Sequence, residues 1–151
     1  MPKKTKNLKY FEAIGRRKEA VAKVRLFVTG KAKNVSINGI TIKVGEIFVN
    51  KKPIDKYFPS LAEQTQFLHP LKLTSSEDRF PISIMVAGGG KIGQLEAVIH
   101  GLSRALEKID KETYRPILKK YGLLTRDPRA KERRKVGTGG KARREKQSPK
   151  R

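Results

Sequence analysis

The sequence predicts a single domain of mixed helix and strand structure, an α+β body, followed by a long basic tail. Two periodic segments and one boundary support this fold class. From Ala20 to Val28, apolar residues alternate with others, which is typical of a half-buried strand. From Leu95 to Ile109 they fall at helical spacing instead. Beyond Leu124 the only large aliphatic residue is Val136, so that segment has almost nothing to bury.

Charge divides the 151 residues into an arm, a body and a tail. Residues 1–9 hold four lysines and no acid. Residues 10–123 carry a net charge of +9, and residues 124–151 reach +9 in only 28 residues. Ordering one residue costs about 1–2 kcal/mol of backbone entropy, which a segment so poor in apolar groups does not recover. We therefore expect the tail to be disordered until RNA orders it.

The body opens with two segments of strand character that flank a run of cations. The basic side chains between Ala20 and Val28 are expected on the solvent face of their strand. Just before it, Gly15 is followed by Arg16, Arg17 and Lys18. On a turn, all three cations can face one phosphate-rich surface. Such a short run can also be a merely solvated turn, but the charge elsewhere in the chain favours RNA contact.

A hairpin and a capped helix are expected next. Residues 35–37 and 40–44 have strand character and are separated by Asn38-Gly39, the commonest turn of a two-residue hairpin. Ser60 has the properties of an N-cap. Glu63, three residues later, completes a capping box ahead of an apolar segment.

The sequence of the second half of the body predicts a buried strand and two helices. Residues 80–87 form the strand, which three glycines end, and the long helix begins near Gln94. Pro116 is expected to open a further short helix over residues 117–121, and Gly122 to close it.

The glycines of residues 88–93 satisfy the pattern G-x-G-x-x-G between a strand and a helix. A dinucleotide site also needs a second parallel strand ending in an acid about 20 residues on, and no apolar strand follows the helix. A P-loop is excluded because Ile92, not a hydroxyl residue, follows Lys91. Two compatible interpretations remain: the backbone and the helix N-terminus approach an RNA phosphate, or the glycines merely permit a tight turn.

Composition argues against several classes of protein. The chain has no cysteine, and His69 and His100 lack the spacing of metal ligands, so neither a metal nor another cofactor is expected. No nucleophile lies in a recognisable turn with a positioned base, so we expect no enzyme. The best apolar run, residues 82–87, is far shorter than the roughly 20 residues that cross a bilayer. With no targeting segment visible, we expect no membrane partner and a cytoplasmic location.

A formal net charge of +22 requires a polyanionic partner, and nucleic acid is the one that the sequence favours. Tyr10, Phe11 and Phe27 do not form a base-stacking platform, because Phe27 lies in an apolar run. A nucleoid-type protein that bends duplex DNA is the alternative, and charge alone does not separate the two. A small nucleotide-dependent transferase is the rival enzyme class.

Residues 88–106 resemble the signature of the bacterial-type family of small-subunit ribosomal protein nine. Three glycines are followed by Gln94 and a helix that contains small residues and Arg104. Residues 10–22 resemble the opening strand of that family, and residues 124–144 its basic tail. Two departures stand out: residues 31–50 are longer than the usual connection, and Pro149 interrupts the family's terminal Ser-Lys-Arg.

The resemblance implies a four-stranded mixed sheet packed by helices on one face, similar to domain two of small-subunit ribosomal protein five, with a left-handed crossover. It implies a structural constituent of the small ribosomal subunit that binds rRNA in the subunit head, beside neighbouring ribosomal proteins and not as a homo-oligomer. It also implies a tail directed toward the peptidyl-site tRNA.

Charge and resemblance together give a set of candidate residues. The tRNA-proximal residues implied by the resemblance are Lys150 and Arg151. The predicted RNA-binding residues are Arg16, Arg17, Lys18, Gly88, Gly89, Gly90, Lys91, Arg104, Arg126, Arg129, Arg133, Arg134, Lys135, Lys141, Arg143 and Arg144.

Overall fold

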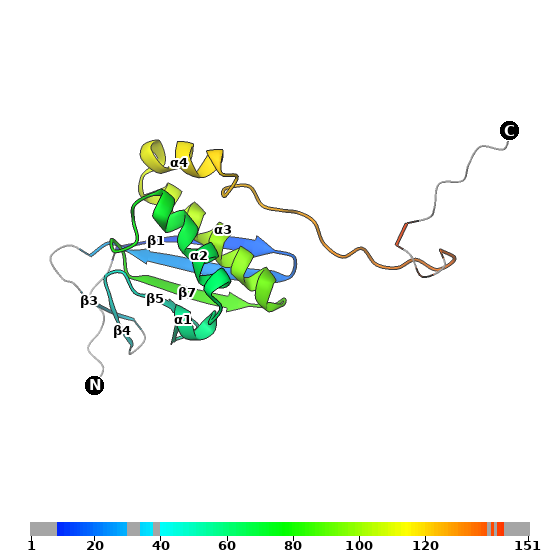
Figure 1. The fold of residues 1–151 in the computed structure, drawn as a ribbon, viewed down its shortest axis with the longest axis horizontal. Coiled ribbons are helices and arrows are strands. Elements are labelled where there is room, and N and C mark those ends of the chain that lie inside the picture. Colours follow the sequence, from blue (N-terminus) through cyan, green and yellow to red (C-terminus); the bar gives the residue numbers. More distant parts are fainter. Residues whose placement is uncertain (1–8, 30–33, 38–39, 139, 141, 144–151) are drawn as a thin grey trace.

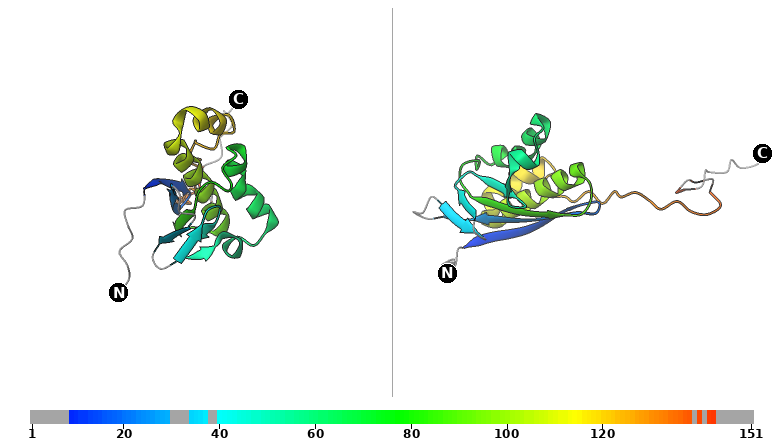
Figure 2. Two further views of the ribbon diagram at one scale, coloured as in Figure 1. Left: turned by 90° about the vertical axis from the view of Figure 1, so that its left-hand side faces the viewer. Right: turned by 90° about the horizontal axis from the view of Figure 1, so that it is seen from below.

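The protein, described here as a computed structural model, is a mixed sheet covered by helices on one face, with a tail that extends away from it (Figures 1 and 2). The structure describes residues 9–29, 34–37, 40–138, 140 and 142–143. The predicted α+β fold class is confirmed. Most of the buried apolar side chains lie between the sheet and the helices in one core.

The main sheet has five strands in the order β1-β2-β7-β5-β6. Their bounds are Tyr10–Arg17 for β1, Ala20–Phe27 for β2, Ile47–Val49 for β5, Lys52–Pro53 for β6 and Ile82–Ala87 for β7. The resemblance implied four strands, and the additional β6 is only two residues long. β5 and β7 are the parallel pair, and all other neighbours are antiparallel. A parallel pair needs a crossover, which here runs through the first two helices. Its left-handedness stays a prediction.

The predicted hairpin forms a small sheet of its own from β3 (Asn34–Ile37) and β4 (Ile40–Lys43). Ile37 pairs with Ile40, which leaves the two-residue loop that the sequence predicts. The loop residues 38–39 lie outside the described part of the chain. Within the long segment 31–50, the hairpin is therefore separate from the main sheet, whereas β5 belongs to it.

Helices α2 (Leu61–Leu73) and α3 (Lys91–Ile109) form where the sequence predicts them, whereas the short helix α1 (Ile54–Tyr57) was not predicted. The capping box is confirmed, with the Glu63 carboxylate accepting the Ser60 N–H at 3.4 Å. The long helix begins at Lys91, one turn earlier than its apolar spacing indicates, because Gly90 serves as its N-cap.

The prediction that Pro116 opens the last helix is wrong, because helix α4 spans Lys111–Lys120 and begins before that proline. The Asp110 carboxylate starts the helix instead, accepting the Thr113 N–H at 3.1 Å, and Pro116 lies inside. The predicted end is confirmed. Gly122 has a φ of +69°, and the Leu123 N–H donates to the Leu118 carbonyl at 3.1 Å, as in a Schellman motif.

The backbones of β1 and α3 touch where two glycines meet. A Cβ on Gly15 would lie 1.9 Å from the Ala97 carbonyl oxygen and 2.3 Å from the Gly101 nitrogen. A Cβ on Gly101 would lie 2.8 Å from the Val24 Cγ2 atom and 3.0 Å from the Gly15 nitrogen. Small residues at this crossing therefore let α3 lie directly on the sheet, and they fix the position of its N-terminus.

We expect Gly101→Ala to destabilise the protein by about 1–3 kcal/mol, because the new methyl group overpacks this crossing. Gly93→Ala in the same helix is the matched control. Its Cβ would meet only ordinary contacts at 3.7 Å, so the gain in helix propensity, up to about 1 kcal/mol, should dominate. Urea unfolding of both variants checks the opposite signs. Equal destabilisation by both would contradict the proposed close approach.

Candidate nucleic-acid interface

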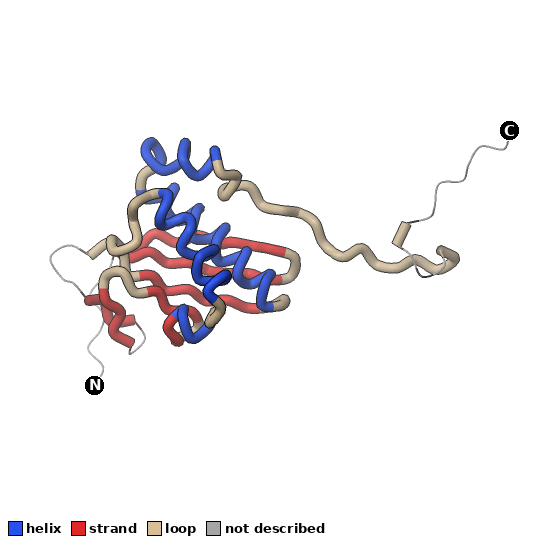
Figure 3. The backbone as a smooth tube through the Cα atoms, in the orientation of Figure 1, coloured by secondary structure: helices blue, strands red, loops and turns tan. Residues whose placement is uncertain are grey.

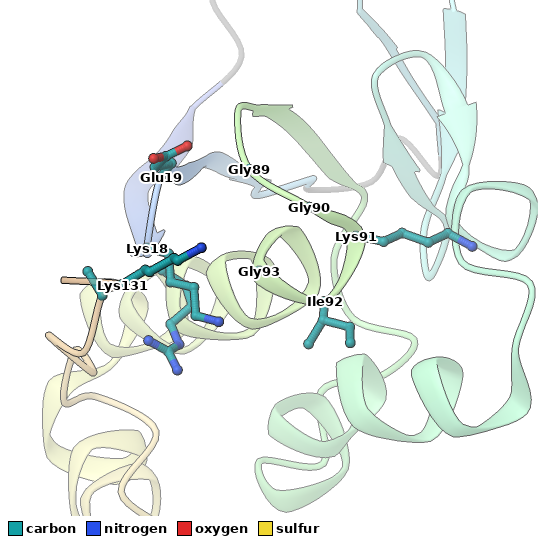
Figure 4. Close-up of a pocket in the computed structure, with 10 residues that line it drawn as sticks. Lys18, Glu19, Gly89, Gly90, Lys91, Ile92, Gly93 and Lys131 are labelled. Carbon is teal, nitrogen blue, oxygen red and sulfur yellow. The ribbon is translucent and has the colours of Figure 1, made fainter. Parts of the chain in front are cut away.

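A cavity of about 470 Å³ lies where the β1–β2 turn, the glycine loop and the start of the tail meet (Figure 4). Each of the three segments contributes one lysine to its lining. In Figure 4, Lys18 and Lys131 lie beside one another, whereas the Lys91 side chain points away from them. The lining residues are Arg17, Lys18, Glu19, Gly89, Gly90, Lys91, Ile92, Gly93, Ala130 and Lys131.

The three glycines of the loop have different roles. Gly88 and Gly89 have φ values of +73° and +64°, a region that favours glycine. A Cβ on Gly88 would also lie 2.6 Å from the Glu19 carbonyl oxygen. Gly90 has nothing within 4 Å of its Cβ position and leaves the N-terminus of α3 open. The first two glycines thus form the tight turn, and an approach of phosphate at Gly90 stays a prediction.

Gln94 holds the glycine loop in place. Its side-chain Nε2 donates to the Gly88 carbonyl at 3.1 Å, and its Oε1 accepts the Tyr57 hydroxyl at 2.8 Å. It therefore links the loop to the end of α1. No pattern in the sequence predicted this contact, although Gln94 stands in the segment that carries the family resemblance.

Arg16 and Arg17 do not lie on a turn, so the expectation that three adjacent cations face one surface is wrong. Both belong to β1, where successive side chains point to opposite faces, and only Lys18 reaches the turn. Arg16 is exposed, whereas Arg17 is only 9% exposed. Arg17 binds Glu96 through Nε, the Asp127 carboxylate through Nη2 at 3.1 Å, and the Arg129 carbonyl through Nη1 at 2.6 Å.

A stripe of three polar side chains on α3, His100, Arg104 and Lys108, covers the free edge of β1. The His100 Nδ1 accepts the Arg16 N–H at 3.3 Å, and the Lys108 Nζ donates to the Glu12 carbonyl at 2.7 Å. Arg104 donates from Nη1 to the Ile14 carbonyl at 2.5 Å. The stripe supplies the hydrogen bonds that an edge strand leaves open. The predicted RNA-binding residue Arg104 thus has a structural contact as well.

The start of the tail is held by the body, and the rest of its described part runs away from it as loop (Figure 3). Leu123 and Leu124 pack against the core. Asp127 accepts several hydrogen bonds from Arg129, which lower the pKa of the Asp127 carboxyl and raise that of the Arg129 guanidinium. Arg143 pairs similarly with Glu132.

Of the other predicted RNA-binding residues of the tail, some are exposed and some lie outside the described part of the chain. The exposed residues are Arg126, Arg133, Arg134 and Lys135. Those outside the described part of the chain are Lys141, Arg144, Lys150 and Arg151. Across the residues that the structure does describe, no helix is long and apolar enough to cross a membrane, and no group of His, Cys, Asp or Glu could hold a metal ion.

A basic body with a lysine-lined cavity, followed by a basic tail, fits the class of structural proteins that bind nucleic acid. Residues 15–151 match the family described as Ribosomal protein S9/S16. The chain is 47% identical over 128 residues to the small ribosomal subunit protein uS9 of Maridesulfovibrio salexigens, covering 85% of this chain and 87% of the relative. It is 44% identical over 131 residues to the uS9 protein of Solidesulfovibrio magneticus, covering 87% and 89%. The chain therefore belongs to the ribosomal protein S9/S16 family.

Family membership confirms the resemblance and the predicted function as a structural constituent of the small ribosomal subunit. It accords with rRNA and other ribosomal proteins as partners, and with the cytoplasmic ribosome as location. A ribosomal protein family is not an enzyme class, and the alternative of a nucleoid-type protein is set aside.

The hydrogen bond of His100 predicts a pH-dependent stability. Burial, followed by the charge of Arg104, lowers the pKa of His100 below its usual 6.5, and the neutral ring accepts the Arg16 N–H. As the pH falls below 6.5, His100 of the unfolded chain binds a proton, whereas His100 of the folded chain stays neutral until its own lower pKa is reached. The free energy of unfolding should therefore decrease as the pH falls from 6.5 toward that lower pKa. Asn offers a similar acceptor that does not titrate. Urea unfolding between about pH 7 and 5 should show the intact protein losing stability relative to His100→Asn, and parallel curves would contradict this.

Proposed function

We propose that the body binds rRNA in the head of the small subunit through the cavity between the β1–β2 turn, the glycine loop and residues 130–131. The observation that carries the proposal is that Lys18 and Lys131 come to one cavity from two separate segments. The start of α3 at Lys91 lines the cavity from a third, although the Lys91 side chain points away from the other two. Among the described residues that line it, Glu19 is the only acid. Each lysine that neutralises a phosphate releases a counterion, which favours binding.

The open end of α3 supports a phosphate at this cavity. The first intrahelical hydrogen bond runs from the Gln94 N–H to the Gly90 carbonyl at 2.9 Å. The N–H groups at the start of a helix have no partner within it, and they carry partial positive charge. Gly90 lets an anion approach them, because no side chain covers the N-cap.

The tail is the second binding element in this proposal, with a boundary to the body at residues 123–124. Arg133, Arg134 and Lys135 are exposed, and in the described part of the chain none of them has an ion pair with a carboxylate. The other predicted RNA-binding residues of the tail add to this element, with Arg129 and Arg143 held by Asp127 and Glu132 in the free chain. The protein acts without catalytic activity and not as a homo-oligomer.

The salt dependence of binding tests the proposed interface. We expect Lys18→Met and Lys131→Met each to make the negative slope of log K against log salt shallower by about 0.7–0.9, the value for one phosphate contact. Lys120→Met is the matched control, because Lys120 is an exposed lysine of α4 that does not line the cavity. Filter binding of the full chain to deproteinised small-subunit rRNA at several salt concentrations gives the slopes. Equal slopes for all three variants would place the contacts elsewhere.

The terminal residues Lys150 and Arg151 are proposed to lie close to the backbone of the peptidyl-site tRNA, as the family resemblance implies. Deleting both should spare subunit assembly and raise the tRNA dissociation rate by a modest factor, since one charge-assisted hydrogen bond contributes about 1.5–3 kcal/mol at most. Pro149 lacks an N–H donor and stiffens the approach, which limits the effect further. Ribosomes with and without the deletion should be compared at low and moderate magnesium. Identical rates at both would refute the contact.

A further inference from the structure

Arg17 joins three parts of the molecule that are far apart in the sequence. The residue stands at the end of β1, its Nε partner Glu96 lies on α3, and its other partners Asp127 and Arg129 belong to the tail. Only 11% of the Arg17 side chain is exposed. All three nitrogens of its guanidinium are used, because the planar fork presents donors in different directions.

The arrangement leaves Arg17 poorly suited to contact RNA itself. Two carboxylates, Glu96 and Asp127, already face its guanidinium, and together with Arg129 they form a locally neutral group. One of its hydrogen bonds reaches the backbone of Arg129 and therefore fixes the path of the chain there rather than a side chain alone. Lys131, two residues further along, lies beside Lys18 at the cavity (Figure 4).

We propose that Arg17 is a positioning residue, which anchors residues 127–129 to the body and so places Lys131 beside Lys18 before RNA binds. The proposal rests on the function proposed for the cavity. An anchored segment has already lost part of the conformational freedom that binding would otherwise remove, so anchoring strengthens binding without adding an RNA contact. Asp127 contributes to RNA affinity through Arg17 although it carries a negative charge.

The sign of the effect at Asp127 distinguishes positioning from simple electrostatics. Removing a carboxylate from a basic tail should strengthen RNA binding if charge alone matters. If Asp127 holds the anchor, Asp127→Ala should instead weaken binding, by about fivefold, because the segment must be ordered on binding. Glu132→Ala is the matched control: Glu132 is a tail carboxylate that pairs with an arginine of the tail, Arg143, and it should leave affinity unchanged or raise it.

The experiment measures affinity and anchoring separately on the full chain. Affinity is measured with deproteinised small-subunit rRNA, and anchoring by the rate of tryptic cleavage after Arg129 in the free protein, followed by mass spectrometry. Asp127→Ala and Arg17→Lys should both speed cleavage and weaken binding, because a lysine keeps the charge but lacks the fork. Glu132→Ala should do neither. Asp127 lies outside the folded core, so the Asp127→Ala variant should fold. It therefore tests the anchor even if Arg17→Lys fails to fold.

Three outcomes would overturn the inference. Cleavage after Arg129 at the same rate in Asp127→Ala would show that no anchor exists. Faster cleavage with unchanged or tighter RNA binding would show that the anchor does not serve the interface. If the variants Lys18→Met and Lys131→Met also leave RNA affinity unchanged, the proposed function of the cavity fails, and the positioning role fails with it.

Discussion

The contact between the backbones of β1 and α3 is the constraint on which the rest of the structure depends. Because neither Gly15 nor Gly101 has a side chain, the helix lies directly on the strand at this crossing. A side chain at either position would separate the two elements, since protein cores do not absorb even one extra methylene without strain. The same placement brings the N-terminus of α3 to the β1–β2 turn, where Gly88 and Gly89 adopt the positive φ values that the short connection requires.

Two sets of polar contacts follow from this placement. The stripe of His100, Arg104 and Lys108 reaches the free edge of β1 only because α3 lies so close to it, and it prevents that edge from pairing with another strand. At the other end of the strand, Glu96 comes within reach of Arg17, whose remaining donors hold the start of the tail. A close backbone contact in the core thereby determines where a basic segment leaves the body.

The sequence predicted those elements well that are determined by residues close together in the chain. The Asn-Gly hairpin and the Ser60 capping box are such cases, because each depends on residues a few positions apart. The start of α4 was predicted from Pro116 alone, whereas the Asp110 side chain caps the helix earlier and Pro116 lies inside it. The prediction of a turn at residues 16–18 is wrong because β1 continues through Arg17. The end of the strand is determined by its pairing with β2 and not by the cations themselves. The ion pairs of Arg17 join residues 79 and more positions apart, and no local pattern encodes them.

The ion pairs separate two groups of cations: those that carboxylates hold within the structure and those left available to bind a phosphate. Within the described residues, the carboxylate pairs belong almost entirely to arginines, namely Arg17, Arg25, Arg115, Arg129 and Arg143, with Lys23 the single lysine. An arginine fork suits a carboxylate bidentately and holds a fixed geometry, whereas a lysine is a compact, strongly hydrated charge on a flexible stem. The lysines of the cavity, Lys18, Lys91 and Lys131, have no ion pair in the part of the chain that the structure describes. With only 14 acids against 36 basic residues, the carboxylates are too few to neutralise the chain. Five of them hold an arginine in the described residues, namely Glu12, Glu96, Glu107, Asp127 and Glu132. Part of the unpaired charge lies on the lysines of the cavity and on the exposed cations of the tail, where a phosphate backbone can take the place of carboxylates.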